Sequence, residues 1–339
     1  MKNAKTNFSK KIELDILLTT KCNLNCKHCL YREKGDSDDL PYELFLNLLE
    51  DLEDNTELHL LGGEPLCRDD INKIISVATK QKKYTQILTN GYSADKDTLQ
   101  DLKDAGLKEI GFSIDGTKEI HNSNRGRDDS FERVIKAISE ASRLGYEPKV
   151  STALYKDNKE SIFQLILKLN ELDLKRMLIE YVLPLGKGEQ LKEKVIKPEE
   201  WLSFIEKLSK FKKEKDISLP IVIQKVFSKK SANSFDCTCT NGKYPVIDAF
   251  GNYYPCILLY AARYPLGNIK EDSFNKLNSN KSISSFINRI QEEYSSSGED
   301  YPKNLCPALK IMIQKGKLSL KNLDFSEYTI GCFHDVSVI

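Results

Sequence analysis

The sequence has little of several features that mark whole classes of protein. Its 339 residues include one tryptophan, three methionines and four histidines, and no run of about 18 apolar residues occurs. The 51 basic and 50 acidic residues leave a formal net charge of +1. This balance excludes the strong positive field that draws proteins to nucleic acid or to anionic membranes. We therefore expect neither a nucleic-acid partner nor a membrane span.

An export signal is also missing. The first 18 residues are basic, but Glu13 and Asp15 interrupt the only apolar stretch among them, so no signal-peptide core is present. We therefore expect a cytoplasmic protein. Nine cysteines, an odd number, argue against a disulfide framework in a reducing compartment. Clustered cysteines there are more often metal ligands or reactive groups.

The first two thirds of the chain alternates two patterns. Short β-rich runs alternate with amphipathic helical patterns of crossover length, and a longer helix is expected at 198–215. This order predicts parallel strands with right-handed connections, in either a doubly wound sheet or a partial barrel. In both, the loops at the carboxyl ends of the strands carry the chemistry. The expected strands are 13–18, 57–61, 85–89, 109–114, 149–154 and 177–182.

The pattern changes after about Lys225. Residues 228–234 are polar, as in a linker, and the β-rich runs 244–250 and 253–257 flank a Gly-Asn pair that predicts a hairpin turn. The sequence therefore predicts two domains, at 1–225 and 232–339. The second holds five of the nine cysteines.

Three cysteines stand together in the loop after the first expected strand. Cys22, Cys26 and Cys29 form a CxxxCxxC pattern. Three closely spaced thiolates can bind three irons of a [4Fe–4S] cluster and leave the fourth iron open to a chelating small molecule. Spacing alone also allows zinc, but a structural zinc site takes four ligands, and only His28 lies nearby.

Further motifs follow successive strands in order. With the cysteines, they make residues 10–190 resemble the radical S-adenosylmethionine (SAM) superfamily, although His28 stands where that family usually has an aromatic residue. The motifs are Gly62-Gly63-Glu64-Pro65, Thr89-Asn90-Gly91, Ser113-Ile114-Asp115-Gly116, His121 with Arg125-Gly126, and Pro184-Leu185-Gly186.

The resemblance implies a partial (β/α)6 TIM barrel in which Cys22, Cys26 and Cys29 hold the cluster. It also implies a SAM site, where the Glu64 loop binds the amino group and Arg125 can grip the carboxylate. The chemistry implied is one-electron cleavage of SAM to methionine and a 5′-deoxyadenosyl radical, which abstracts a hydrogen atom. A flavodoxin or ferredoxin would donate the electron. The expected SAM contacts are Gly62, Gly63, Glu64, Asn90, Ser113, Asp115, Arg125, Thr152, Asn158 and Leu185.

The tail resembles the SPASM/twitch extension of these enzymes. Eleven residues separate Cys239 from Gly251, and four more precede Cys256, which matches the extension's hairpin motif. The denser cysteine run of a two-cluster domain is absent, so we expect one auxiliary [4Fe–4S] cluster. A zinc ribbon is the alternative, but its paired CxxC hooks are missing. Four of five cysteines would bind the cluster: Cys237, Cys239, Cys256, Cys306 and Cys332.

The substrate stays open between three hypotheses. Modification of a ribosomally made peptide is the commonest role of such relatives, by a crosslink, a thioether or an epimerisation. Oxidation or epimerisation of a sugar or aminocyclitol is the second, and a non-catalytic iron–sulfur electron carrier is the third. We expect no leader-binding domain before the barrel, and Ile257 replaces the aspartate of sulfatase maturases. No catalytic residue is assigned; Cys67 and a spare tail thiol are the candidates.

Overall fold

Parallel strands and outer helices build most of the molecule. A computed structural model of the chain describes residues 11–31, 38–229, 241–293, 306–315, 328–330 and 336–339. Strands β1 to β7 run parallel in chain order, each beside the next. They are β1 (Glu13–Leu17), β2 (Glu57–Leu61), β3 (Tyr84–Thr89), β4 (Glu109–Ser113), β5 (Lys149–Leu154), β6 (Arg176–Tyr181) and β7 (Ile221–Gln224).

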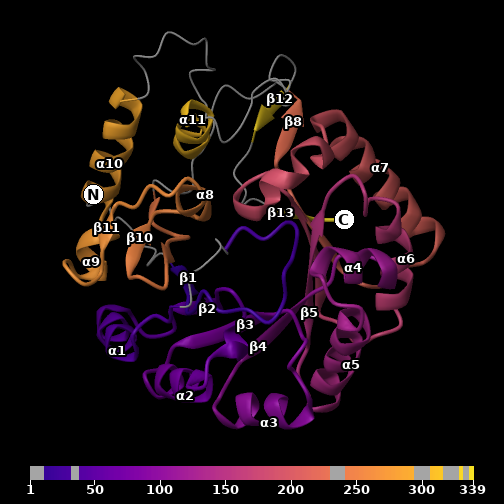
Figure 1. The fold of residues 1–339 in the computed structure, drawn as a ribbon, viewed down its shortest axis with the longest axis horizontal. Helices are drawn as coiled ribbons and strands as arrows, with labels where there is room; N and C mark the ends of the chain where they lie inside the picture. The colour runs from indigo at the N-terminus through magenta and orange to yellow at the C-terminus, as the bar shows by residue number, and fades with distance from the viewer. Residues whose placement is uncertain (1–10, 32–37, 230–240, 294–305, 316–327, 331–335) are drawn as a thin grey trace, which may run out of the picture.

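This arrangement confirms the predicted partial barrel and adds one strand to it. Figure 1 shows the strands as an arc with the helices on its outer side. Strand β7 was not predicted, because it is only four residues long and just three of them are apolar. The outer helices are α1 (Tyr42–Asp51), α2 (Ile71–Lys80), α3 (Lys96–Asp104), α5 (Ser130–Arg143), α6 (Ser161–Leu169) and α7 (Pro198–Glu214).

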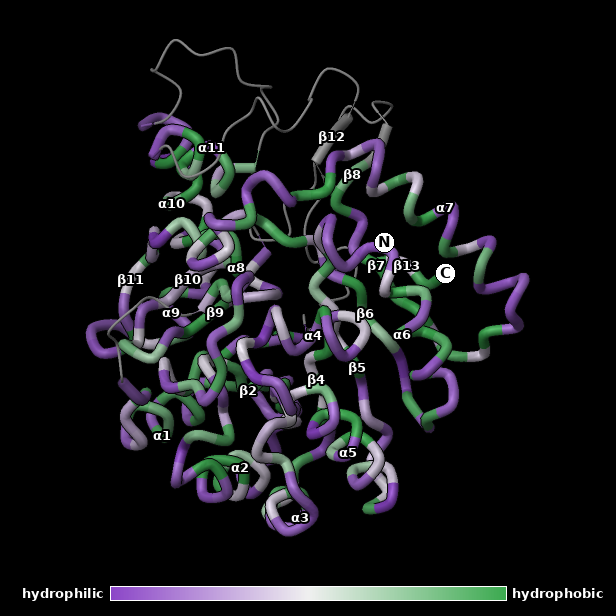
Figure 2. Tube along the Cα trace, turned by 45° about the vertical axis from the view of Figure 1, so that its right-hand side comes forward, coloured by the Kyte–Doolittle hydropathy of each residue, from purple (hydrophilic) through white to green (hydrophobic). Residues whose placement is uncertain are grey.

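Local sequence explains where these helices begin and which face they bury. Helix α3 starts after Asp95, whose carboxylate accepts a hydrogen bond from the Thr98 amide at 2.9 Å. Helix α7 starts at Pro198, and Glu200 accepts from the backbone of Lys197 at 3.0 Å. In α5 the buried residues recur at helical spacing, and Figure 2 shows such helices alternating between hydrophobic and hydrophilic segments.

The predicted hairpin is present and joins the barrel sheet. It consists of β9 (Val246–Ile247) and β10 (Asn252–Tyr254), which pair antiparallel. Strand β9 also pairs in parallel with β1, where Ile16 is opposite Ile247. Strand β11 (Gly267–Asn268) extends this edge, and β13 (Val336–Val338) pairs antiparallel with β7 at the other edge. Both edges of the barrel sheet are therefore covered by strands of the C-terminal part.

Shorter elements complete the described part of the chain. Helix α10 (Asn280–Glu293) lies in the C-terminal part, and β8 (Phe227–Lys229) pairs with β12 (Tyr328–Ile330). None of the helices in the described ranges has the length and hydropathy needed to cross a membrane. The remaining elements are α4 (Lys118–Arg125), α8 (Ile257–Ala261), α9 (Phe274–Leu277), α11 (Pro307–Gln314), η1 (Pro65–Cys67) and η2 (Gly186–Lys194).

Candidate active site

Two loops lie against each other at the carboxyl end of β1. The cysteine loop, residues 18–31, carries the three clustered cysteines, and the double-glycine loop, residues 62–65, follows β2. The Gly63 amide donates to the carbonyl of Thr19, and the Glu64 amide donates to that of Lys21, both at 2.7 Å. A Cβ on Gly63 would lie 2.1 Å from the Lys21 oxygen. Gly62 has a φ of +140°, which L side chains rarely adopt. Only glycines allow this close approach of the two loops.

Glu64 connects the loops that follow β2 and β3. Its carboxylate is 2% exposed and accepts from the Thr89 hydroxyl at 2.7 Å, the Asn90 amide at 2.8 Å and the Leu66 amide at 3.1 Å. Burial raises the pKa of Glu64, and these donors oppose that shift. In this structure the Glu64 carboxylate holds the two loops together by these hydrogen bonds. A direct contact between Glu64 and SAM stays a prediction.

Asn90 lies next to the first cysteine. Its side-chain nitrogen donates to Asn23 at 2.8 Å and lies 3.9 Å from the sulfur of Cys22. Its side-chain oxygen accepts from the Tyr92 amide at 2.8 Å. The TNG motif is therefore folded onto the cysteine loop, as the resemblance implies for a shared site.

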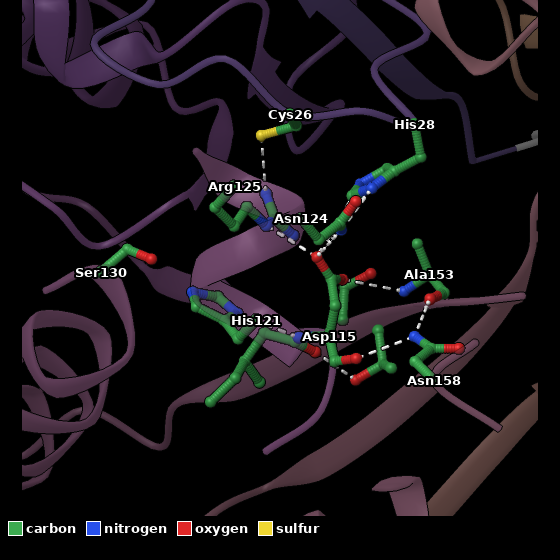
Figure 3. A network of polar contacts seen from close by, with 12 residues as sticks. Cys26, His28, Asp115, His121, Asn124, Arg125, Ser130, Ala153 and Asn158 are labelled. Carbon is green, nitrogen blue, oxygen red and sulfur yellow. Dashed lines mark hydrogen bonds and ion pairs between the residues drawn. The ribbon is translucent and has the colours of Figure 1, made fainter. Parts of the chain in front are cut away.

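A buried ion pair lies beside the second cysteine. The Nε of Arg125, on α4, is 2.7 Å from Oδ2 of Asp115, and its Nη1 is 3.6 Å from the sulfur of Cys26 (Figure 3). Asn124 donates to Asp115 at 2.8 Å and contacts His28 at 2.7 Å. Burial alone would raise the pKa of Asp115, but the guanidinium holds it far below its usual range. A permanent positive charge is thus fixed next to Cys26.

Other predicted SAM contacts brace the loops around Asp115. The Thr152 hydroxyl donates to the carbonyl of Ile114 at 2.6 Å, and Asn158 donates to the carbonyl of Asp115 at 2.8 Å; both side chains are fully buried. Leu185 is also buried, whereas Ser113 at the end of β4 is half-buried. The structure brings these residues to the same end of the barrel, and their contact with SAM stays a prediction.

The three cysteines suit a cluster better than a single ion. A tetrahedral zinc site would hold its sulfurs roughly 3.8 Å apart. Among the described residues, only Glu13, Glu57 and His59 place three ligand atoms within 4.8 Å of one another, so the three sulfurs are spread more widely than one ion requires. Burial raises the pKa of Cys22 to about 12. A bound iron offsets this shift because it stabilises the thiolate.

A row of polar side chains that was not predicted from the sequence lies inside the barrel. Along β1, Leu14 and Ile16 are fully buried on one face, whereas Asp15 and its neighbour on β2, His59, lie on the inward face and are half-buried. Opposite them, Ser151 on β5 donates to Glu180 on β6. A filled TIM barrel packs this position with branched apolar residues. The polar alternation in the strands was the signal that could have revealed an open interior.

Two tail cysteines are described, and both are buried. Cys256 directly precedes α8, and Cys306 directly precedes α11. These two helices contact each other. Cys237, Cys239 and Cys332 lie outside the described residues, so the ligand set of the auxiliary cluster stays a prediction. Cys67 is half-buried in η1.

Comparison with known proteins decides the family. The family model "Radical SAM superfamily" matches residues 16–169, and the model "Iron-sulfur cluster-binding domain", SPASM, matches residues 237–306. The chain belongs to the radical SAM superfamily. It carries a radical SAM domain, of the type that binds a [4Fe–4S] cluster with SAM. This is followed by a SPASM domain, of the type that binds auxiliary iron–sulfur clusters.

Several curated proteins are similar to this radical SAM enzyme. The subtilosin biosynthesis protein AlbA of Bacillus subtilis is 29% identical over 80% of this chain and 60% of its own length. The AdoMet-dependent heme synthase of Methanosarcina barkeri is 26% identical over 83% of this chain and 85% of its own. The chain therefore spans about 60% of the length of the first of these relatives.

Solved structures share the fold at low sequence identity. Streptococcus suis SuiB bound to precursor peptide SuiA superposes with a TM-score of 0.71 at 18% identity, over 89% of this chain and 71% of SuiB. The structure of anSMEcpe with AdoMet and the Kp18Cys peptide gives 0.67 at 20% identity, over 89% of this chain and 94% of that one. These likenesses support the partial barrel followed by the hairpin-bearing domain.

Proposed function

We propose that this radical SAM enzyme modifies a ribosomally synthesised peptide by forming a crosslink or thioether or by inverting a stereocentre. AlbA is named for the biosynthesis of a bacteriocin, and SuiB is seen with its precursor peptide. The observation that carries the proposal is a cavity between the barrel and the hairpin, which we call the seam cavity. Its lining joins Gly62 of the double-glycine loop to Phe250 and Tyr254 of the hairpin.

The size of the seam cavity favours part of a long substrate over a whole small molecule. Its volume is about 220 Å³, whereas pockets that enclose small molecules measure about 300–1,000 Å³. A peptide can place one side chain in such a space while the rest of the chain lies outside it. The cavity also lies beside the predicted SAM loop, which suits a substrate that must meet the radical.

The residues of the site would orient SAM and keep charge in place. When bound, the cluster and SAM supply the electron transfer and the 5′-deoxyadenosyl radical. Arg125 keeps its positive charge because Asp115 pairs with it in a buried position, and its Nη1 faces Cys26. The remaining guanidinium nitrogen, Nη2, makes no hydrogen bond within the described residues and can take the SAM carboxylate.

The test uses the reconstituted enzyme under anaerobic conditions. SAM, dithionite and a synthetic peptide copied from a short reading frame beside the gene are added, and 5′-deoxyadenosine and peptide mass are measured. We expect 5′-deoxyadenosine together with a peptide that has lost two hydrogen atoms, or that has gained solvent deuterium at one centre. Formation of 5′-deoxyadenosine without any change in the peptide contradicts the proposal.

A tetrapyrrole substrate is the second candidate. It is favoured by the match to the Methanosarcina barkeri heme synthase, which covers most of both chains. A parallel reaction with iron-coproporphyrin in place of the peptide separates the two. Turnover of the porphyrin and not of the peptide would support this second candidate and exclude the first.

A further inference from the structure

Aromatic rings form much of the wall of the seam cavity. Tyr260 of α8 lies at the centre of this wall, with its ring centroid 6.1 Å from that of Tyr31 and 5.4 Å from that of Tyr254. The Tyr254 and Tyr260 rings meet edge to face, at 88°. The Tyr260 hydroxyl donates to the carbonyl of Tyr31 at 3.2 Å. The loop after β1, which carries Tyr31, and the C-terminal part, which carries Tyr254 and Tyr260, therefore form this wall together.

Phe250 adds an exposed aromatic ring to the same lining. It is 39% exposed and is one of few large apolar side chains left so open in the described part of the chain. The turn that carries it is fixed, because Asp248 accepts from the amides of Phe250 and Asn252, both at 2.9 Å. A single exposed ring is ordinary on a protein surface. Because the backbone that carries it is fixed beside the cavity, this ring is positioned to contact what enters.

The charged groups of the lining balance each other. Asp248 uses one carboxylate oxygen for the turn amides and the other for the Tyr254 hydroxyl, at 3.0 Å, and the Asn252 side chain, at 2.9 Å. Arg263 lies over the Tyr260 ring, 4.6 Å from its centroid, and its backbone has a φ of +53°. This left-handed residue ends helix α8, where the Arg263 amide donates to the carbonyl of Tyr260 at 2.9 Å. One acid and one base leave no net charge to attract an ionic ligand.

We propose that the seam cavity binds an uncharged aromatic side chain of the substrate peptide, between the exposed ring of Phe250 and the Tyr260–Arg263 wall. This inference rests on the proposed peptide-modifying function and adds the class of side chain that is recognised. Offset and edge-to-face ring contacts, together with the nearby guanidinium, favour an aromatic group over an aliphatic group of similar size. The volume of about 220 Å³ limits the occupant to one side chain.

The test measures binding and needs no turnover. Ac-Trp-NH2, Ac-Tyr-NH2, Ac-Leu-NH2 and Ac-Glu-NH2 are titrated by ligand-observed NMR into the anaerobic enzyme loaded with its clusters and SAM. We expect the aromatic amides to bind roughly five- to tenfold more tightly than Ac-Leu-NH2. Phe250→Ser and Arg263→Lys should each remove most of that preference. Leu167→Ser is the matched control, because Leu167 is similarly exposed, at 41%, on the outer helix α6.

Each outcome bears on one of the two proposals. Equal binding of Ac-Leu-NH2, tighter binding of Ac-Glu-NH2, no binding of Ac-Trp-NH2, or an aromatic preference kept by both variants would overturn the aromatic subsite. Thermal unfolding of each variant shows whether it is folded, and the exposed position of Phe250 makes its replacement mild. An aromatic preference lost in both variants supports the subsite. If the peptide reaction described above also fails, the peptide-modifying function falls, whatever these binding constants are.

Discussion

The sulfur of Cys26 lies beside the positively charged side chain of Arg125, and Arg125 is in turn paired with Asp115. The Asp115–Arg125 pair is buried, and removing one partner of such a pair leaves an uncompensated charge that costs about 3–5 kcal/mol. We expect Asp115→Asn to lower the free energy of unfolding by about 3 kcal/mol. Urea unfolding measures the change, with the exposed Asp101→Asn as control. A loss no larger than that of the control would show that Arg125 finds another partner.

The individual cysteines make a second prediction. We expect Cys22→Ala, Cys26→Ala and Cys29→Ala each to lose about four irons per chain and all formation of 5′-deoxyadenosine. Cys256→Ala should instead lose the auxiliary iron and destabilise the tail, because cluster binding contributes to folding there. Iron analysis and a SAM-cleavage assay measure both effects. Unchanged iron and turnover in Cys256→Ala would contradict its role as a ligand.

At the scale of elements, the double-glycine loop is held by its backbone contact with the cysteine loop. A Cβ on Gly63 would collide with the main chain at Lys21, which cannot move as a flexible side chain would. We expect Gly63→Ala to weaken SAM binding more than tenfold, because the loop must shift. Gly111→Ala is the control, since the nearest atom to its Cβ would be the tip of the flexible Leu88 side chain, at 3.1 Å, and its backbone neighbour lies at an ordinary 3.7 Å. Equilibrium dialysis measures the SAM affinity of each variant. Equal affinities of Gly63→Ala and Gly111→Ala would show that the close contact at Gly63 is not needed for SAM binding.

Strands β1 and β2 also share an ionisable contact inside the barrel. Burial alone would lower the pKa of His59, but hydrogen bonds to Asp15, at 2.8 Å, and Glu57, at 3.4 Å, outweigh it and raise the pKa to about 9. The stabilisation is complete below pH 6.5 and is lost as the pH rises through 9. It amounts to roughly 1–3 kcal/mol. We expect the difference in unfolding temperature between wild type and His59→Gln to become smaller as the pH rises from 6 to 9.5. A difference that stays constant over this range would contradict the raised pKa of His59.

Across the whole molecule, sequence periodicity predicted six parallel strands and the hairpin, because these depend on local patterns, while the barrel order of the strands was implied by the family resemblance. It did not predict that β9 would pair with β1 or β13 with β7. Such pairings join residues that are more than a hundred positions apart, and no local pattern encodes them. For the same reason the sequence did not predict the hydrogen bonds by which Glu64 and Asn158 join neighbouring loops, and their contact with SAM stays a prediction. A sequence motif shows which residue types are present, but the contacts that each side chain makes are visible only in the structure.

The edge strand β13 gives a prediction for the molecule as a whole. It covers β7 through residues 336–338, and the Lys212 side chain bonds the carbonyl of Ile339 at 2.5 Å. Removing residues 336–339 uncovers the edge of the sheet, and uncovered edges promote aggregation. We expect a lower unfolding temperature and concentration-dependent light scattering. A truncated protein that stays monodisperse and equally stable would show that this edge needs no cover.

The pairing of both barrel edges with later segments sets an order of events during synthesis. When β7 leaves the ribosome, neither β9 nor β13 has yet emerged, so β1 and β7 are both uncovered. The loop with Cys22, Cys26 and Cys29 is by then complete, next to the still open β1 edge. The cysteine loop can therefore emerge and fold before the hairpin pairs with β1, so its assembly does not depend on the C-terminal part being present.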